Sequence, residues 1–394
     1  MRKLVGNSVT TRHLPSSAII LGIVSFFADL STEMAYPILP LFFSSLGTKP
    51  AVMGLIEGIA EATASITSGI SGIISDRVGK RKPLVLLGYG MTTLAKPIVA
   101  LATGWPAVMF GRFLDRFGKG IRSAPKDAVL SDVSTKADRG RVFGFERMMD
   151  SLGAVAGPLI ALWLFHQLHL ELGTILLLTV IPSAIALILA TRLAEPNTVK
   201  PSLRLTFGQM SSRFWIFIAI YALFSLGNSS NIFILLKGID VKLSEATIIA
   251  GYTVYNVVYS GASYPAGAIS DKLGRRDVLI VGFLIYAMSY LGFALASTMW
   301  HYFVLFAFYG SYAALTDGVS KAMAADIGKE ATATALGTFL AVTGITKLLA
   351  SVLAGLLWQG LNSNSVFYFG AATSALAAVL LFIAIRNHPD GERP

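Results

Sequence analysis

The chain has 394 residues, of which 54% are hydrophobic and 14% are charged. Soluble domains carry roughly 25% charged residues, so these charged side chains are too few to cover a soluble fold. The composition therefore excludes soluble enzymes, disordered proteins and coiled coils. Because the sequence has no cysteine, it has no disulfide, no thiolate metal ligand and no cysteine nucleophile. A net charge of +10 in so apolar a chain indicates basic loops beside a membrane and not a nucleic-acid-binding surface.

Twelve stretches of the sequence are long and apolar enough to span a bilayer. A helix needs about 20 apolar residues to cross the ~30 Å hydrocarbon layer. In chain order the stretches cover residues 17–43, 50–73, 83–103, 106–125, 142–165, 172–191, 214–236, 246–269, 278–297, 301–322, 333–358 and 364–385. The sequence therefore predicts an all-α membrane protein with twelve transmembrane helices. The first stretch is too long for the apolar part of a signal peptide and is expected to remain as the first span.

The distribution of basic residues predicts the orientation of these spans. If both termini are cytoplasmic, the inner loops and tails hold 21 Lys and Arg residues, whereas the outer loops hold only Lys49, Lys237 and Lys242. Cytoplasmic loops of membrane proteins are enriched in Lys and Arg. We therefore expect a multi-pass protein of the inner, cytoplasmic membrane with both termini in the cytoplasm.

The sequence also repeats itself. Residues 72–82 read GIISDRVGKRK and residues 267–277 read GAISDKLGRRD, and each stretch follows the second span of its half on the basic side. This repeat predicts two pseudo-symmetric six-helix bundles, residues 1–192 and residues 213–394, joined by a cytoplasmic linker over residues 193–212. Parallel halves of this kind hold the binding site of a transporter between them.

The repeated loops carry a resemblance to a known family. The pattern G-x-x-x-D-[RK]-x-G-[KR]-[RK], placed after spans 2 and 8, resembles the loop signature of the major facilitator superfamily. Residues 113–132, FLDRFGKGIRSAPKDAVLSD, also resemble a group of bacterial and archaeal efflux permeases of that superfamily. The resemblance covers the whole chain in topology. It implies a secondary transporter that works by alternating access, with spans 3, 6, 9 and 12 on the outside of the bundles.

The repeated loops are predicted to gate the inner side of the transporter. Gly79 is expected to permit a tight turn, and Asp76 to cap a helix of the opposite half, which the resemblance identifies as span 11. Lys80 or Arg81 is expected to pair with Asp127. The alternative is that these charges only anchor the loops at the membrane surface. The predicted gating residues are Gly72, Asp76, Arg77, Gly79, Lys80, Arg81, Asp127, Gly267, Asp271, Gly274 and Arg275.

Charged residues inside the spans point to a proton-coupled mechanism. An ionised group that faces lipid costs several kcal/mol, so these side chains should face the bundle interior, where Asp29 and Glu33 are expected to contact Arg112 and Arg116. A carboxylate whose arginine neighbour moves away changes its proton affinity. The alternative is a static set of buried ion pairs. The predicted proton-coupling residues are Asp29, Glu33, Arg112, Asp115, Arg116, Glu146 and Asp150.

The second half supplies the predicted substrate-binding face. Span 8 carries Tyr and Asn side chains at helical spacing, which suit an amphipathic ligand through stacking and hydrogen bonding; polar packing between helices is the alternative. The predicted binding residues are Asn228, Asn231, Tyr252, Tyr255, Asn256, Tyr259, Asp317 and Lys347. Three further contacts are expected: Lys119 or Arg122 with Glu146 or Asp150, Asp317 with Lys321, and Lys347 with Glu57 or Glu61.

The preferred function is export of a small organic solute by proton antiport, because the element from Gly153 to Pro158 resembles part of the antiporter signature of efflux members. Proton-coupled uptake of a small anionic or zwitterionic metabolite is the alternative within this class, and a membrane receptor without transport is the alternative class. We expect a monomer in the lipid bilayer whose partners are protons and a small-molecule substrate. No enzymatic activity, cofactor or nucleic-acid partner is expected. A bound metal ion is not expected because no histidine lies in mid-membrane, and ATP is not expected because no phosphate-binding loop is present.

Overall fold

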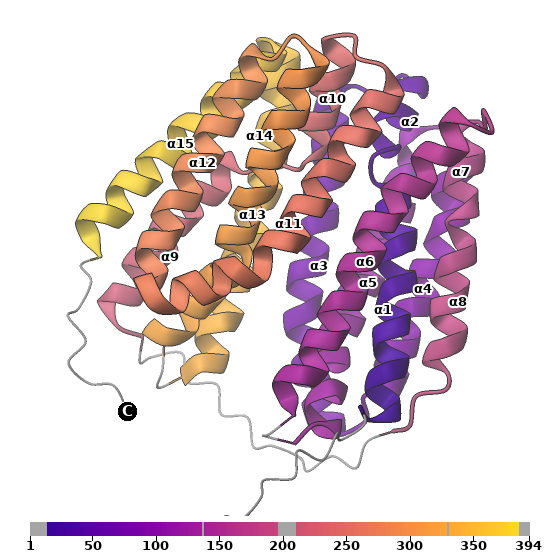
Figure 1. The fold of residues 1–394 in the computed structure, drawn as a ribbon, viewed down its shortest axis with the longest axis vertical. Coiled ribbons are helices and arrows are strands. Elements are labelled where there is room, and N and C mark those ends of the chain that lie inside the picture. The colour runs from indigo at the N-terminus through magenta and orange to yellow at the C-terminus, as the bar shows by residue number, and fades with distance from the viewer. Residues whose placement is uncertain (1–13, 136–137, 196–209, 329–330, 386–394) are drawn as a thin grey trace, which may run out of the picture.

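The computed structural model describes residues 14–135, 138–195, 210–328 and 331–385, and within these ranges it contains helices and no strands (Figure 1). The first bundle consists of α1 (Ser16–Ala35), α2 (Leu39–Ser45), α3 (Pro50–Val78), α4 (Lys82–Ala100), α5 (Trp105–Val133), α6 (Arg139–His166), α7 (Leu172–Leu178) and α8 (Val180–Ala190). The second consists of α9 (Ser212–Gly227), α10 (Ile232–Asp240), α11 (Glu245–Leu273), α12 (Arg275–Leu295), α13 (Met299–Ile327), α14 (Thr332–Gly360) and α15 (Ser363–Ala384). The predicted all-α fold with two six-helix bundles is confirmed. The predicted linker over 193–212 lies mostly outside the described residues and stays a prediction.

Three of the twelve predicted spans are broken into two helices each. The break between α1 and α2 falls at Pro37, whose nitrogen carries no hydrogen for the helical ladder. The break between α9 and α10 falls at residues 228–231, an Asn-Ser-Ser-Asn stretch. Such side chains compete with the backbone for hydrogen bonds. Both breaks therefore follow from local chemistry.

The composition of the helices separates the centre of the molecule from its outside. Eight helical segments are long and apolar enough, by length and composition alone, to cross a membrane. The four other long helices, α3, α5, α11 and α13, have 29 residues each and carry the central polar and charged side chains. By contrast, the outer helices expose large apolar side chains such as Leu94 of α4 (65% exposed) and Met288 of α12 (63% exposed). A surface of this kind is suited to lipid.

Close helix approach within the first bundle depends on the glycines of α6. A Cβ atom at Gly157 would lie 2.7 Å from the Met34 nitrogen and 2.8 Å from the Leu30 oxygen of α1. A Cβ atom at Gly153 would collide with the Phe26 carbonyl oxygen of the same helix. The G-x-x-x-G element of the predicted antiporter signature therefore packs α6 against α1, as small residues do in membrane helix pairs.

The two bundles meet at one end and separate at the other. At the end that we call the closed end, α2 packs against α10, and a hydrophobic core joins Met34 and Ile38 of the first bundle to Phe233 and Leu235 of the second. Along the centre, α3 packs against α14 and α6 against α11. At the other end, which we call the open end, the lower parts of α6 and α11 splay apart (Figure 1).

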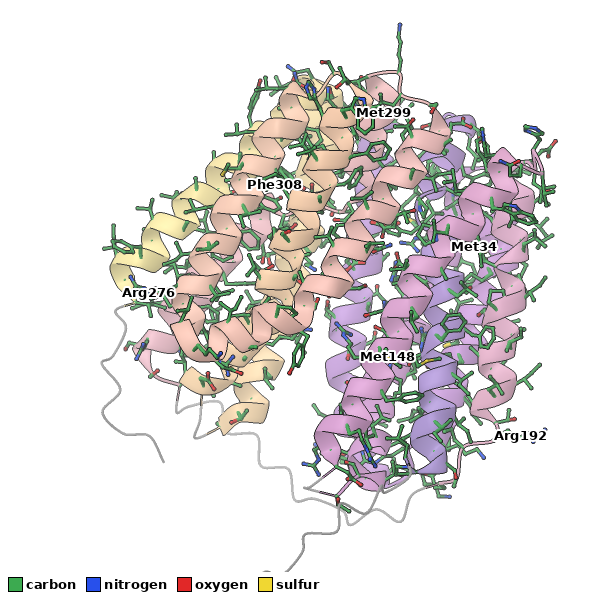
Figure 2. The ribbon with its side chains drawn as sticks, in the orientation of Figure 1. Met34, Met148, Arg192, Arg276, Met299 and Phe308 are labelled. Atoms are coloured by element: carbon green, nitrogen blue, oxygen red, sulfur yellow. The ribbon has the colours of Figure 1, made fainter. Side chains whose placement is uncertain are left out.

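The open end is the end that carries the repeated loops. There α3 ends at Gly79, whose φ of 70° is in the left-handed region, as the sequence predicts for a tight turn. Gly274 of the second loop has a φ of 94°. Arg192 and Arg276 lie toward this end, whereas Met299 lies near the closed end (Figure 2).

Candidate functional site

A central cavity of about 370 Å³ lies between the two bundles. It falls in the usual size range of small-molecule sites, roughly 300–1,000 Å³. Side chains from α1, α3, α5 and α6 line one side, and side chains from α11, α13, α14 and the turn between α9 and α10 line the other. The structure brings together here most of the residues predicted for coupling and binding, namely Asp29, Glu33, Arg116, Asp150, Asn228, Asn231, Tyr252, Tyr255, Asn256, Tyr259, Asp317 and Lys347.

Glu33 connects the two bundles across this cavity. Its carboxylate accepts a hydrogen bond of 2.8 Å from the Tyr252 hydroxyl and one of 3.3 Å from the Asn256 side-chain nitrogen, both on α11. The prediction that Glu33 contacts Arg112 or Arg116 is therefore wrong. Glu33 does line the central cavity, but the direction in which it points depends on the rotation of α1 within the bundle.

Arg112 belongs to a buried ion-pair network inside the first bundle and does not line the central cavity. Its Nε and Nη2 atoms each donate a 2.8 Å hydrogen bond to the Glu57 carboxylate, which is fully buried. Its Nη1 atom lies 3.5 Å from Asp115, whose other oxygen lies 3.6 Å from Lys96 of α4. Lys96 of the outer helix α4 is buried and thus points inward. The expected contact of Arg112 with Asp29 or Glu33 is wrong, because the Arg112 guanidinium is hydrogen-bonded to Glu57 instead.

A second group of acids lies where α1, α5 and α6 meet. The Asp29 and Asp150 carboxyl groups lie within hydrogen-bonding reach of each other, and Arg147 Nη1 lies 3.3 Å from Asp150. Glu146, one turn below Asp150, accepts a 2.5 Å hydrogen bond from Lys126. The expected contact of Glu146 or Asp150 with Lys119 or Arg122 is therefore wrong.

The helix turns of α5 explain this difference. Arg122 points to α4, where it donates a 2.7 Å hydrogen bond to Thr92 and lies over the Tyr89 ring. Lys126, one turn further along α5, takes its place beside Glu146. Lys126 was counted in the sequence as a loop residue because the fourth span was expected to end at residue 125, eight residues before α5 ends.

Three cations from two bundles surround one acid on another side of the cavity. Arg116 and Lys119 of α5 and Lys347 of α14 all line the cavity, and all act electrostatically on Glu61 of α3. Lys347 and Glu61 thus line the same cavity from different halves, but no salt bridge within 4.0 Å joins them in the described part of the chain, so the expected contact is not formed in this arrangement. Arg116 is 5% exposed, and its Nε has no hydrogen-bond partner among the described residues.

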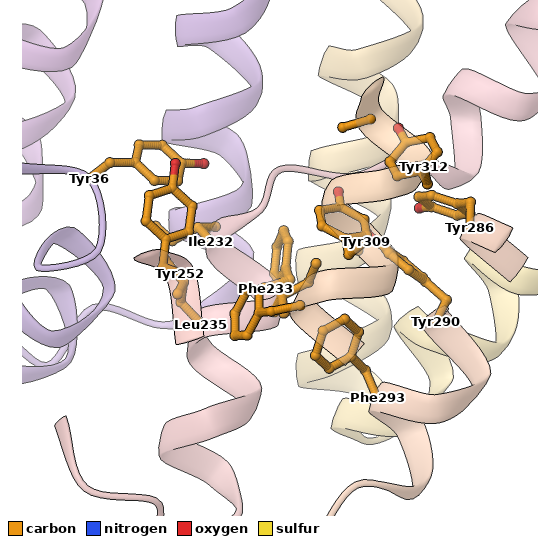
Figure 3. Close-up of a cluster of buried hydrophobic side chains, with 14 of the residues drawn as sticks. Tyr36, Ile232, Phe233, Leu235, Tyr252, Tyr286, Tyr290, Phe293, Tyr309 and Tyr312 are labelled. Carbon is orange, nitrogen blue, oxygen red and sulfur yellow. The ribbon is translucent and has the colours of Figure 1, made fainter. Parts of the chain in front are cut away.

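Tyrosines form a continuous stacked row along the cavity. Tyr36 of α1 stacks on Tyr252, which stacks on Tyr255, which stacks on Tyr259, with ring centroids 5.4, 5.4 and 6.0 Å apart. Figure 3 shows Tyr36 and Tyr252 side by side although they come from different bundles. Tyr36 was missed in the sequence. Its position in a Tyr-Pro break of the first span was the available signal.

The hydroxyl groups of this row and its neighbours are held by the protein itself. Tyr36 shares a 3.0 Å hydrogen bond with Ser230, and Tyr259 donates one of 3.1 Å to Asp317. The predicted binding residues Asn231 and Asn228 bond to Tyr309 and Tyr312, each at 2.7 Å. The polar face of the second half therefore serves internal packing as well as lining the cavity. The expected Asp317–Lys321 salt bridge is absent from the described residues, because Asp317 faces Tyr259 instead.

A second cavity, of about 970 Å³, continues along the seam between α6 and the helices α11 and α13. Arg147, Tyr259 and Asp317 line both cavities, whereas Gly267, Asp271 and Arg275 line only the second. The second cavity therefore extends from the central site to the repeated loop at the open end.

The repeated loops form the same ion-pair arrangement in both bundles. Arg81 lies 3.3 Å from Asp76 of its own loop and 2.6 Å from Asp132 at the end of α5. In the second loop Arg275 lies 3.2 Å from Asp271 and also pairs with Asp326 of α13. The expected pairing of Lys80 or Arg81 with Asp127 is therefore wrong for Arg81. Asp132 and Asp326, the second partners of these two arginines, were missed in the sequence.

The remaining predicted gating residues lie at this open end without the expected cross-bundle contacts. Gly72 approaches α5, where a Cβ atom would lie 3.2 Å from Ala124. Arg77, Lys80 and Asp127 are exposed. Asp76 bonds to Arg81 of its own loop, and no hydrogen bond joins it to α14 among the described residues. Within the described ranges, no group of three or more His, Asp or Glu side chains is placed to hold a metal ion.

Comparisons with known proteins agree with this architecture. The family model of the Major Facilitator Superfamily matches residues 21–237 and 216–394. An uncharacterized MFS-type transporter of Methanocaldococcus jannaschii is 35% identical over 394 residues, which cover 96% of this chain and 98% of that protein. The multidrug resistance protein MdtH of Salmonella arizonae is 25% identical over 284 residues, which cover 70% of each chain.

Solved structures show the same fold. A crystal structure of the nucleoside transporter NupG superposes with a TM-score of 0.78 at 15% identity, covering 94% of this chain and 100% of that one. A transporter of the POT family, in complex with a conjugated peptide, superposes with a TM-score of 0.79 at 12% identity, covering 94% and 96%. The family match over both halves, together with the two bundles and their shared cavity, shows that the chain belongs to the Major Facilitator Superfamily and is a multi-pass membrane transporter of that superfamily.

Proposed function

We propose that the protein exports a small organic solute across the cytoplasmic membrane in exchange for protons. The observation that carries this proposal is the carboxyl pair formed by Asp29 and Asp150 on the wall of the central cavity. Two ionised carboxyl groups this close repel each other, and in this proposal a proton that binds one of them removes the repulsion. A cation that enters the cavity favours release of that proton.

Glu33 supports the same proposal from the interface of the bundles. Its two acceptor contacts with Tyr252 and Asn256 require the two halves to be in the relative position seen here. A change of access from one end of the molecule to the other would break these contacts and free Glu33 to bind a proton. The other predicted coupling residues, Arg112, Asp115, Arg116 and Glu146, act in this proposal by fixing the charge around the pair. The repeated loops, with Asp76 and Asp271, would close the open end in the opposite state.

The direction of transport rests on relatives rather than on the glycines of α6. MdtH is named as a multidrug resistance protein, which fits export. Gly153 and Gly157 pack against α1, so their presence is explained by packing whichever way the solute moves. Proton-coupled uptake therefore stays the second candidate. Export and uptake are distinguished by whether protons move against the solute or with it.

The test uses the purified protein in liposomes with an imposed pH gradient and a fluorescent or radiolabelled compound found by thermal-shift screening. Antiport predicts that the compound accumulates when the liposome interior is acidic, because protons leave as the compound enters. Symport predicts accumulation when the exterior is acidic. Asp29→Asn and Asp150→Asn should each abolish the response to the gradient, whereas Asp240→Asn, which alters an ion pair with Lys237 outside the cavity, should leave it intact. Flux that ignores the pH gradient would disprove proton coupling.

A further inference from the structure

The charged groups that line the central cavity are segregated by sign. We define the basic wall as Arg116, Lys119 and Lys347, which surround the single acid Glu61. We define the acidic wall as Asp29, Asp150 and Asp317, a side of the cavity on which Arg147 is the lining base and pairs with Asp150. Glu33 also lines the cavity, but its carboxylate is already bonded to Tyr252 and Asn256. The cavity thus has an excess of positive charge where α3, α5 and α14 meet and an excess of negative charge along α1, α6 and α13.

The basic wall contains a buried guanidinium. Arg116 is nine-tenths buried or more and lines the cavity, and its Nε atom makes no hydrogen bond among the described residues. A buried donor that stays unsatisfied carries a desolvation cost, which is larger when the group is charged. No salt bridge within 4.0 Å forms between Glu61 and Arg116, Lys119 or Lys347 in the described part of the chain. An anionic group in the cavity would add a second negative charge beside these three cations, and a guanidinium suits a carboxylate.

Other polar groups of the cavity are already satisfied and so do not select a ligand in the same way. The Tyr36, Tyr252 and Tyr259 hydroxyls bond to Ser230, Glu33 and Asp317. Their rings remain as a stacked apolar strip along the cavity. What the cavity lacks is an anion at the basic wall and a cation at the acidic wall.

We infer that the central cavity binds a zwitterionic organic solute in one orientation, with its carboxylate on Arg116 and Lys347 and its ammonium group on Asp29 and Asp150. The middle of the solute lies against the tyrosine strip. The inference rests on the proposed function in that it assigns the solute that this site carries. It also connects to the proposed coupling, since an ammonium group at Asp29 and Asp150 replaces the proton that the pair would otherwise hold.

The test measures binding to the detergent-solubilised protein with a matched set of probes. The set contains para-(aminomethyl)benzoate, its amine-only analogue para-methylbenzylamine and its acid-only analogue para-toluate, together with β-alanine, γ-aminobutyrate and ε-aminocaproate as zwitterions of increasing length. We expect at least one zwitterion to bind roughly tenfold more tightly than each of its single-charge analogues, because each analogue forfeits one charge-assisted contact. Titration calorimetry or thermal shift gives the dissociation constants.

Substitutions then assign each charged end of the probe to its wall. In Arg116→Gln the zwitterion should bind only as tightly as its amine-only analogue, and the affinity of that analogue should be unchanged. Lys347→Gln is measured in the same way if Arg116→Gln fails to fold. In Asp29→Asn the pattern should reverse, with the acid-only analogue unaffected. Lys242→Gln and Asp240→Asn, which lie outside the cavity, serve as controls and should bind all probes as the unsubstituted protein does.

Three results would overturn the inference: no zwitterion of the set binds, a single-charge analogue binds as tightly as its zwitterion, or the Arg116 and Asp29 substitutions weaken both kinds of analogue equally. These results are separate from the failure of the proposed function. A zwitterion that binds as described but moves across liposomes without regard to the pH gradient would leave the site assignment standing and remove the proton coupling.

Discussion

At the scale of single residues, the molecule uses two kinds of arginine–carboxylate contact. Arg112 and Glu57 form a bidentate pair in which Glu57 is 0% exposed. Arg147 and Asp150 form a looser pair in which the Arg147 side chain is 62% exposed. A buried pair is costly to break because the remaining charge stays in a medium of low polarity, whereas an exposed pair contributes little.

This contrast predicts different costs for removing the two arginines. Arg112→Met should lower the free energy of unfolding by about 3–5 kcal/mol, and Arg147→Met should lower it by less than about 1 kcal/mol. Thermal or denaturant unfolding in detergent measures both. The double variant Arg112→Met/Glu57→Gln removes the stranded charge and should regain part of the loss. Equal stability of Arg112→Met and Arg147→Met would contradict the ion-pair geometry.

At the scale of helices, the contact between α3 and α14 is the longest interface between the two bundles. The two helices can approach each other closely because glycines lie at their contact. A Cβ atom at Gly54 would collide with the Ser351 carbonyl oxygen, and one at Gly355 would lie 2.6 Å from the Pro50 oxygen. By contrast, a Cβ atom at Gly69 of α3 would have no neighbouring atom within 4 Å. Gly54 and Gly69 of α3 thus differ in whether the second bundle lies against them.

The interface predicts opposite signs for one substitution at two positions of α3. Gly54→Ala should destabilise the protein by about 1–3 kcal/mol, because overpacking forces backbone shifts. Gly69→Ala should be neutral or stabilising by up to about 1 kcal/mol, because alanine favours helix. Unfolding temperatures of the two variants, measured side by side in one detergent, provide the comparison. A stabilising Gly54→Ala would mean that α3 and α14 do not approach as closely as described.

At the scale of the whole molecule, the bundles are joined at the closed end and apart at the open end, where the repeated loops lie (Figure 1). In this arrangement Asp76 contacts Arg81 of its own bundle. We propose that the predicted cap of α14 by Asp76 forms in the opposite state, in which the open end has closed. The loops would then hold that end shut through contacts between the bundles.

This latch predicts that Asp76→Asn shifts the population toward the open arrangement. The chain contains no cysteine, so a spin-label pair on Arg139→Cys and Lys272→Cys, both exposed at the open end, reports the distance between the bundles. Loss of a charge-assisted contact of roughly 1.5–3 kcal/mol should change the ratio of long to short distances by about tenfold or more. Asp240→Asn at the closed end serves as the control. An unchanged distance distribution in Asp76→Asn would reject the latch.

The sequence predicted the site more fully than it predicted the contacts within it. Most of the coupling and binding residues do line one cavity, because a charge inside a span must avoid lipid and can only face the interior. The predicted partners of Glu33, Arg112, Glu146 and Arg81 were nevertheless wrong. Each error is a rotation about a helix axis or a shift of one turn, which hydrophobicity along the chain does not record.

The sequence by itself determined the helical spans, the two halves, the repeated loops and that charges within the spans face the interior, because these depend on local apolar length and on the cost of charge in lipid. The tertiary structure alone decided which acid meets which base, that Tyr36 completes a tyrosine row across the two bundles, and that positive and negative side chains occupy separate walls of the cavity. These features depend on how each helix is rotated and tilted against its neighbours, and that is set by side-chain packing between segments far apart in the chain.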